Sequence, residues 1–174
     1  MKNRKFVSEF VSLFQIILLF VALVMIFLPA ININDGDVIY SGLDVVFGKV
    51  VIHDILIGTF EYTVLEFSIL NLLAYVLIFV GIIILLFMFL NKIKGSKTVD
   101  FMMFLILAVA GVLLLFTIKF TIVGEGFTDL YSFFSGSDFN LSNYAKLGTG
   151  PIIGGVCTLV ASFFSLGKLL LMDK

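Results

Sequence analysis

The sequence predicts an all-α transmembrane four-helix bundle with a small extracellular antiparallel β-sheet. Composition gives the first indication, because 61% of the 174 residues are hydrophobic and 13% are charged, whereas a soluble domain has about 45–50% apolar and about 25% charged residues. Mean hydropathy is +1.21. The second indication is a set of apolar runs that reach the roughly 20 residues needed to cross a bilayer; they fall at about 6–29, 67–90, 101–120 and 150–170.

These spans leave no room for a separate soluble domain, so residues 1–174 are interpreted as a single membrane domain. The first apolar run follows a basic start, which also occurs in secretory signal peptides. We expect a retained span, because the run is longer than a usual signal-peptide core and 28–30 makes a poor cleavage site. Long loops are predicted at 31–66 and 121–149, and a short linker at 91–100.

Lysine and arginine residues predict the orientation of the chain. The termini and the linker carry most of them, namely Lys2, Arg4, Lys5, Lys92, Lys94, Lys97, Lys168 and Lys174. The two long loops carry Lys49, Lys119 and Lys146 among nine acidic residues. Because positive residues near span ends stay on the cytoplasmic side, we predict a multi-pass cell-membrane protein with both termini in the cytoplasm and both long loops outside.

Small and polar residues at helical spacing predict which faces of the spans pack together. Such residues let two helix backbones approach closely or form hydrogen bonds within lipid. In the fourth span they recur every four residues, and the third and first spans each have a shorter set. The predicted packing residues are Gly150, Gly154, Thr158 and Ser162, with Ala108 and Gly111 in the third span and Ser12 and Gln15 in the first.

The first long loop is rich in strand and turn signals. Asn34-Asp35-Gly36-Asp37 predicts a hairpin turn, because Asp-Gly accepts the positive φ angles of a tight turn. Short β-branched and aromatic runs follow at 45–47, 49–53 and 59–65. We predict an antiparallel sheet of about three to five strands on the outer ends of the helices. In the second loop, 127–134 predicts a short amphipathic helix near the membrane surface.

Polar residues of the first loop suggest two further sites, each with a simpler explanation. Asp35, Asp37 and Asp44 could supply calcium ligands, but the glycine is misplaced for a calcium loop, and turn chemistry on an acidic surface is favoured. His53 next to Asp54 could begin a hydrolytic or metal site, although neighbours in a strand point to opposite faces. We therefore predict no catalytic residue, no bound metal and no cofactor.

The net charge and the cysteine content limit which partners and cross-links are possible. A formal net charge of −1 provides no basic surface of the kind that binds nucleic acid. The only cysteine, Cys157, falls in the fourth span, so no disulfide can form within one chain. The lipid bilayer is the one partner that the composition requires.

The order of the segments resembles a known architecture. Four spans with a cytoplasmic start, a longer β-rich first loop and a shorter second loop are similar to the claudin and peripheral-myelin-protein group. That group has a tryptophan–glycine–leucine–tryptophan signature and a cysteine pair in its first loop, whereas this chain has no tryptophan and one cysteine. The blocks FLPAININDGD, YSGLDVVFG, EFSILNLLAY and LGTGPIIGG resemble small four-span membrane proteins of Gram-positive-type bacteria. The resemblance implies a tetraspan layout, and an architecture does not settle a function.

The leading functional hypothesis is a non-enzymatic membrane scaffold that acts through its outer domain. Transport usually leaves ionisable groups inside the spans, and we expect none between the membrane interfaces. An outer sheet edge can instead pair with another copy or with another membrane or envelope protein. The predicted outer interaction surface comprises Asp35, Asp37, Tyr40, Val45, Val46 and Phe47. The alternatives are an accessory subunit of a transporter or envelope-synthesis complex, and a small channel or carrier.

Overall fold

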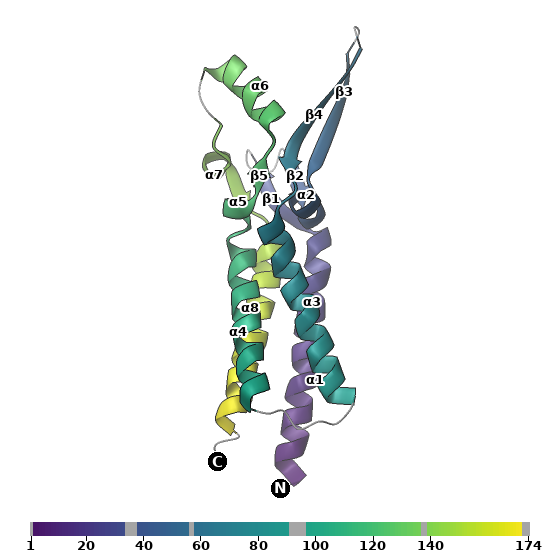
Figure 1. Ribbon diagram of the computed structural model, residues 1–174, viewed down its shortest axis with the longest axis vertical. Coiled ribbons are helices and arrows are strands. Elements are labelled where there is room, and N and C mark those ends of the chain that lie inside the picture. The colour runs from purple at the N-terminus through teal and green to yellow at the C-terminus, as the bar shows by residue number, and fades with distance from the viewer. Residues whose placement is uncertain (1, 34–37, 56–57, 91–96, 137–138, 172–174) are drawn as a thin grey trace.

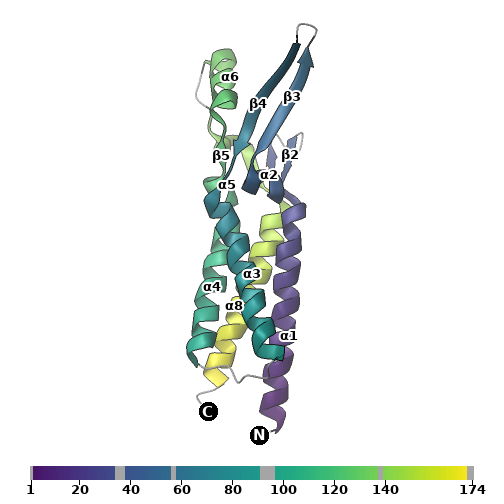
Figure 2. The same cartoon turned by 45° about the vertical axis from the view of Figure 1, so that its right-hand side comes forward.

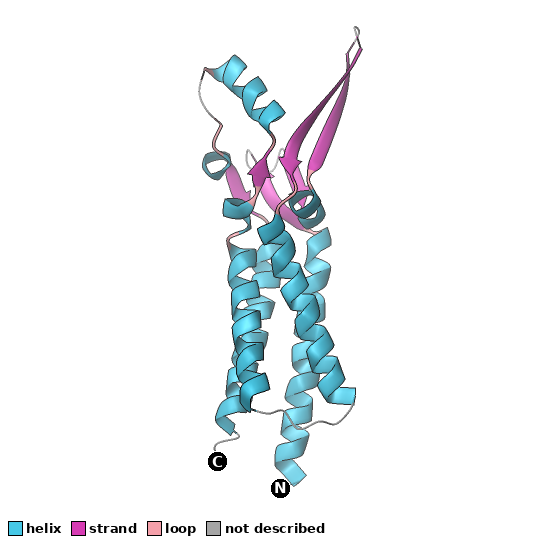
Figure 3. Ribbon diagram, in the orientation of Figure 1, coloured by secondary structure: helices cyan, strands magenta, loops and turns pink. Residues whose placement is uncertain are grey.

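The molecule has two parts, a bundle of long helices and a strand-rich cap at one end of it (Figures 1 and 3). The computed structural model describes residues 2–33, 38–55, 58–90, 97–136 and 139–171. The cap comprises the described residues within 29–66 and 117–148. The predicted hairpin turn with Asp35 and Asp37, and residues 91–96 of the predicted linker, lie outside the described residues.

Long helices form the bundle, as the apolar runs predict. They are α1 (Lys2–Val24), extended by the 3-10 helix η1 (Met25–Phe27), α3 (Ile69–Leu90), α4 (Lys97–Leu115) and α8 (Thr149–Leu171). Within the described part of the chain, four helices are long and apolar enough to cross a membrane. The start of α1 and the end of α8 lie at the end of the bundle opposite the cap (Figures 1 and 2), which we name the terminal end.

Helix α4 ends earlier than the predicted third span, because the chain leaves helical geometry at Phe116. The Phe116 backbone has φ −98° and ψ 15°, and the Thr117 hydroxyl donates to the Leu114 carbonyl at 2.6 Å. A separate short helix, α5 (Thr117–Phe120), occupies the last residues of the predicted span at 101–120. The third span of the structure is therefore shorter than its apolar run.

Two antiparallel sheets of three strands each lie in the cap, where the sequence predicts one sheet. The first has the order β2-β1-β6, and the second has the order β3-β4-β5. The strands are β1 (Pro29–Ile33), β2 (Val38–Ser41), β3 (Lys49–Ile55), β4 (Gly58–Glu66), β5 (Ile122–Val123) and β6 (Ala145–Leu147). Each sheet thus takes two strands from the first loop and one from the second.

A short helix separates the two sheets at a place where the sequence predicts a strand. The run 45–47 belongs to α2 (Gly42–Phe47), so the prediction of a strand there is wrong. The Ser41 hydroxyl accepts from the Asp44 amide at 3.2 Å, and the Asp44 carboxylate accepts from the Ser41 amide at 3.0 Å. Such a reciprocal capping box starts a helix, and here it outweighs the strand preference of the valines.

Small residues bring α8 close to α1. The stripe predicted from the sequence is buried along its length, at Gly150, Gly154, Thr158 and Ser162. A Cβ atom added at Gly150 would lie 2.7 Å from the Met25 carbonyl oxygen. One added at Gly154 would lie 3.4 Å from the Ala22 carbonyl oxygen. The two backbones therefore approach one another where the glycines stand.

The two predicted packing residues of α4 lie in different surroundings. Gly111 is buried, and a Cβ atom added there would lie 2.7 Å from the Leu159 side chain of α8. Ala108 is half-buried and lines an apolar groove of about 260 Å³ on the outside of α4, together with Val109, Val112 and Leu113. Of these two residues, Gly111 is the one that packs against α8.

The predicted short helix of the second loop is α6 (Glu125–Ser135), followed by α7 (Leu141–Tyr144). Helix α6 lies at the far side of the cap from the bundle (Figures 1 and 2), so the expectation that it lies near the membrane surface is wrong. Its aromatic face packs on the cap instead, where the Phe127 and Tyr62 rings stack with centroids 6.4 Å apart.

Candidate binding cleft

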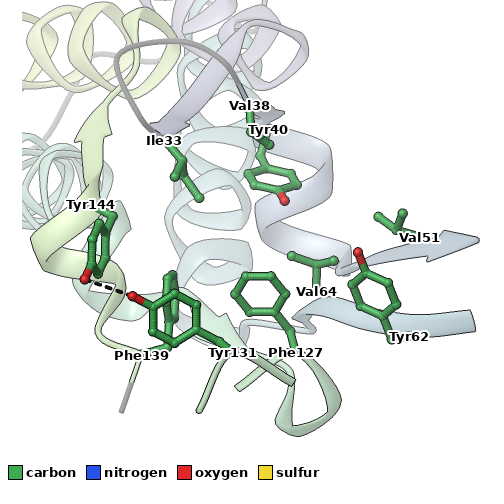
Figure 4. A pocket seen from close by; sticks show the side chains of 10 residues that line it. All are labelled: Ile33, Val38, Tyr40, Val51, Tyr62, Val64, Phe127, Tyr131, Phe139 and Tyr144. Atoms are coloured by element: carbon green, nitrogen blue, oxygen red, sulfur yellow. Dashed lines mark hydrogen bonds between the residues drawn. The ribbon is translucent and has the colours of Figure 1, made fainter. Parts of the chain in front are cut away.

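A cleft opens in the cap between the two sheets and α6 (Figure 4). Its volume is about 550 Å³, within the range of about 300–1,000 Å³ that is typical of binding pockets. The first four strands, α6 and the segment that carries α7 all contribute side chains. The lining residues are Ile33, Val38, Tyr40, Val51, Tyr62, Val64, Phe127, Tyr131, Phe139 and Tyr144.

Aromatic rings form one side of the cleft around Phe139. The Phe139 ring meets the Phe127 and Tyr131 rings edge to face, each with centroids 5.0 Å apart. It stacks on the Tyr144 ring at 5.6 Å. Aromatic pairs at these distances stabilise beyond simple burial, by about 0.5–1.5 kcal/mol each. This ring cluster therefore joins α6 to the segment that carries α7.

The described residues that line the cleft include six aromatic rings and no charged side chain. Burial raises the pKa of Tyr40, and the neighbouring Tyr62 and Asp44 raise it further. A hydrogen bond with Tyr131 raises the pKa of Tyr144, and the two hydroxyl oxygens lie 3.0 Å apart (Figure 4). Tyr40 and Tyr144 are therefore neutral at physiological pH and present uncharged ring faces and hydroxyl groups to the cleft.

The predicted outer interaction surface lies only partly at the surface. Tyr40 lines the cleft. Val45 and Val46 are only 1% and 0% exposed, because α2 directs one into the cap core and the other into the bundle core; assigning them to an interaction surface is wrong. Phe47, at the end of α2, is 60% exposed.

Sequence reasoning missed most of the aromatic residues of the cleft. Phe127 and Tyr131 stand one helical turn apart in α6, and this spacing predicts a shared face but not its partner. Tyr62 and Val64 stand on the same face of β4, as alternation along a strand requires. Phe139 carries no comparable signal, because it lies between α6 and α7 without periodic neighbours.

A cluster of polar side chains is buried within the bundle toward its terminal end. The Lys168 ammonium donates to the Ser12 hydroxyl at 2.7 Å and to the Gln15 amide oxygen at 2.5 Å. The Gln15 amide nitrogen donates in turn to the Ser165 hydroxyl and the Ala161 carbonyl, both at 2.8 Å. Lys168 is only 6% exposed. Both packing residues predicted for the first span thus bind a lysine of α8.

Asp100 adds a buried carboxylate on α4. It is 2% exposed, and its Oδ2 atom has no hydrogen-bond partner among the described residues. Asp100, in the first turn of α4, and Lys168, in the last turn of α8, are therefore ionisable groups buried among the long helices. The expectation that none lies between the membrane interfaces stays a prediction. A lysine near a helix end usually extends to the membrane interface, but Ser12 and Gln15 offer Lys168 acceptors inside the bundle.

The acidic residue Asp44, considered above as a calcium ligand, already has protein partners. Its Oδ1 atom lies 3.0 Å from the Lys49 ammonium, and its Oδ2 atom accepts from the Ser41 amide and hydroxyl. Within the described ranges, no group of three or more His, Cys, Asp and Glu side chains could hold a metal ion. His53 and Asp54 are neighbours in β3.

Comparisons with models of protein families, with curated proteins and with solved structures find no match to this chain. The functional proposal therefore rests on the geometry of the cleft and of the buried polar cluster.

Proposed function

We propose that this protein is a non-enzymatic integral membrane scaffold that binds a protein partner in the cleft of its cap. The observation that carries the proposal is a cleft of about 550 Å³ whose described lining residues are aromatic or aliphatic and carry no charge, held at one end of helices that could cross a membrane. Aromatic anchors in pockets supply much of the binding energy of protein interfaces. Tyrosine adds a hydroxyl group that can hydrogen-bond to the partner.

In this proposal the cap faces the outside of the cell and the termini face the cytoplasm. The lysine and arginine distribution supports that orientation. The layout then parallels the claudin group in span order and cap position, as an architectural analogy. Glu61→Cys and Thr98→Cys, each made with Cys157→Ser, test the orientation, because Glu61 and Thr98 are exposed at opposite ends. An impermeant thiol reagent on intact cells should label only the Glu61→Cys variant, and the reverse result would contradict the orientation.

Purification in mild detergent, followed by sizing and identification of co-purifying chains, tests the proposed contact. We expect the wild-type protein to form an ordered homopolymer or to hold another membrane or envelope protein in a fixed ratio. Tyr62→Ala and Phe127→Ala remove rings from the cleft and should release the partner. Phe133→Ala should not, because Phe133 is 82% exposed on the same helix and does not line the cleft. Complexes unchanged in both cleft variants would contradict the proposal. A foreign subunit retained by them would favour an accessory subunit held through a bundle face, such as the groove at Ala108.

A small carrier is the second candidate, because two ionisable side chains are buried among helices that could span a membrane. Such groups often mark ion or proton pathways. Reconstitution of the purified protein into liposomes measures ion or solute flux directly. A flux that is lost in Lys168→Met and kept in Tyr62→Ala would favour the carrier over the scaffold.

A further inference from the structure

We propose that the occupant of the cleft is a basic, amphipathic peptide segment of the partner protein. Its apolar side chains lie among the rings, and its lysine or arginine side chains lie against the ring faces. This inference rests on the proposed function and specifies the chemistry of the partner. Three observations support it: the ring faces, the charge of the cap, and the sheet edges beside the cleft.

The faces of aromatic rings attract cations. A lysine or arginine placed over the face of a tyrosine or phenylalanine gains electrostatic attraction, and most where water is excluded. The described lining of the cleft includes six aromatic rings and no charged side chain. A cationic side chain entering it would therefore meet ring faces without competition from a lysine or arginine in the lining.

The charge of the cap favours the same occupant. Its described residues include three lysines, Lys49, Lys119 and Lys146, and twice as many acidic residues, namely Asp44, Asp54, Glu61, Glu66, Glu125 and Asp129. Lys49 is already paired, with its ammonium 3.0 Å from the Asp44 carboxylate. A surface of one sign raises the local concentration of oppositely charged partners and speeds their association. Basic segments are thus drawn to the cap, and acidic ones are repelled.

The sheet edges beside the cleft favour a peptide over a small cation. Strand β2 is at the edge of one sheet and β3 at the edge of the other, and both contribute lining residues, among them Tyr40 and Val51. Within the described part of the chain, no further strand pairs with either edge. An extended peptide can add its backbone to such an edge while its alternate side chains enter the adjoining pocket.

The absence of tryptophan from the chain provides a direct test. A short peptide that alternates lysine with leucine around one central tryptophan is titrated with the full-length protein in non-ionic detergent. Its fluorescence reports the peptide alone. We expect a blue shift on binding and an affinity at least about tenfold tighter than that of a matched peptide with glutamine in place of lysine. The advantage should shrink as salt is raised, and a glutamate peptide should bind weakest.

Two leucine substitutions test whether the lysine peptide is bound by the aromatic ring faces or only by the apolar character of the cleft. Tyr62→Leu and Phe127→Leu keep an apolar wall in the cleft but remove a π face. Both should reduce the advantage of the lysine peptide over the glutamine peptide, with a smaller change in binding of the glutamine peptide itself. Phe133→Leu, on the exposed side of α6, serves as the matched control and should change neither affinity.

The outcomes separate this inference from the proposal on which it rests. If the glutamine peptide binds as tightly as the lysine peptide, the cationic partner is excluded while a cleft-binding scaffold stands. A lysine advantage that survives both leucine variants would also overturn the inference, because the rings would not be its cause. If no peptide binds the wild-type protein, a basic peptide is not the occupant of the cleft. The co-purification experiment described above then tests the scaffold proposal independently.

Discussion

The bundle and the cap differ in how they fill the space between their elements. In the bundle, small residues let helices meet directly, and a Cβ atom added at Gly155 would lie 2.9 Å from Leu115 and 3.2 Å from the Gly111 carbonyl oxygen. In the cap, two sheets and α6 leave about 550 Å³ between them. Interiors of folded proteins are normally close-packed, so the open space of the cap is the exception. In the proposed function, the close-packed bundle supports the cap, and the cleft of the cap binds the partner.

The polar side chains of the bundle and of the cap also differ in their surroundings. The bundle encloses polar side chains and pairs several of them with each other, as Lys168, Gln15 and Ser12 show. The cap turns tyrosine hydroxyl groups toward its cleft, where Tyr131 and Tyr144 pair at 3.0 Å (Figure 4). Buried polar groups without water must find partners in the protein. Those beside an open cleft can offer hydrogen bonds to a ligand. Substitutions in the bundle should therefore change stability, and substitutions in the cap should change stability less.

The largest effect is expected from filling the closest approach in the bundle. Gly150→Leu places its Cβ atom against backbone carbonyls of the segment after α1, at 2.7 Å from Met25 and 3.1 Å from Pro29. Backbone cannot move aside cheaply, so we expect a loss of about 3 kcal/mol. Gly154→Leu should lose less, because its nearest neighbour is the Leu114 side chain at 3.2 Å. Gly167→Leu is the control, with no atom within 4 Å of its added Cβ. Melting temperatures measured in detergent should fall most in Gly150→Leu, less in Gly154→Leu and least in Gly167→Leu. Equal losses in Gly150→Leu and Gly167→Leu would contradict this prediction.

The next effect tests the buried lysine. Lys168→Met removes the donor to Ser12 and Gln15 and the positive charge that interacts electrostatically with the Asp100 carboxylate, which we expect to cost about 2 kcal/mol. Adding Asp100→Asn should recover part of the loss, because neither charge then remains buried. Lys119→Met, at an exposed lysine of α5, should leave the melting temperature nearly unchanged. If the double variant is no more stable than Lys168→Met alone, the two charges are not coupled.

A smaller effect is expected in the cap. Phe139→Ala removes the ring that contacts three others around the cleft, at a cost of about 1.5 kcal/mol. Phe133→Ala truncates an equally large side chain that is 82% exposed, and its loss should be close to zero. In limited proteolysis of the full-length protein, Phe139→Ala should be cut more readily within the cap, while cleavage within the bundle stays unchanged. Opening of the bundle at the same protease concentration would mean that the two parts unfold together.

The sequence predicts the bundle better than the cleft for a physical reason. Each long helix is encoded locally, because its apolar run alone determines whether it can cross a membrane. The rings of the cleft come from segments far apart in sequence, as Tyr40, Tyr62 and Phe127 show, and their meeting depends on how the two sheets and α6 are placed. The same holds for Lys168, whose acceptors stand on α1. Helix α2 is different, since the Ser41-x-x-Asp44 spacing is a local capping signal that precedes its valines.

The smallest expected effect concerns the ion pair that α2 makes with β3. The Asp44 carboxylate lies 3.0 Å from the Lys49 ammonium and also accepts from the Ser41 amide. Burial tends to raise the pKa of Asp44, but the hydrogen bonds from Ser41 and Lys49 outweigh it and hold the pKa below its ordinary value. The folded state therefore binds the proton less tightly than the unfolded state does. Stability from this carboxylate is present above the unfolded pKa of about 3.9 and is lost as pH falls through the lower folded pKa.

Asp44→Asn keeps an oxygen that can accept from the Ser41 amide but removes the negative charge. Because the pair is partly exposed, at 46% for Lys49 and 22% for Asp44, we expect a loss of only about 0.5 kcal/mol at neutral pH. The difference between wild type and variant should begin to shrink as pH falls below about 4 and should close once the pH is below the lowered folded pKa, where the wild-type carboxylate is also neutral. Lys49→Met should lower the melting temperature of the wild type and leave that of Asp44→Asn unchanged. A wild-type advantage that persists at pH values well below 4 would show that the Asp44 contribution comes from packing and capping, and that the charge on α2 does not stabilise the cap.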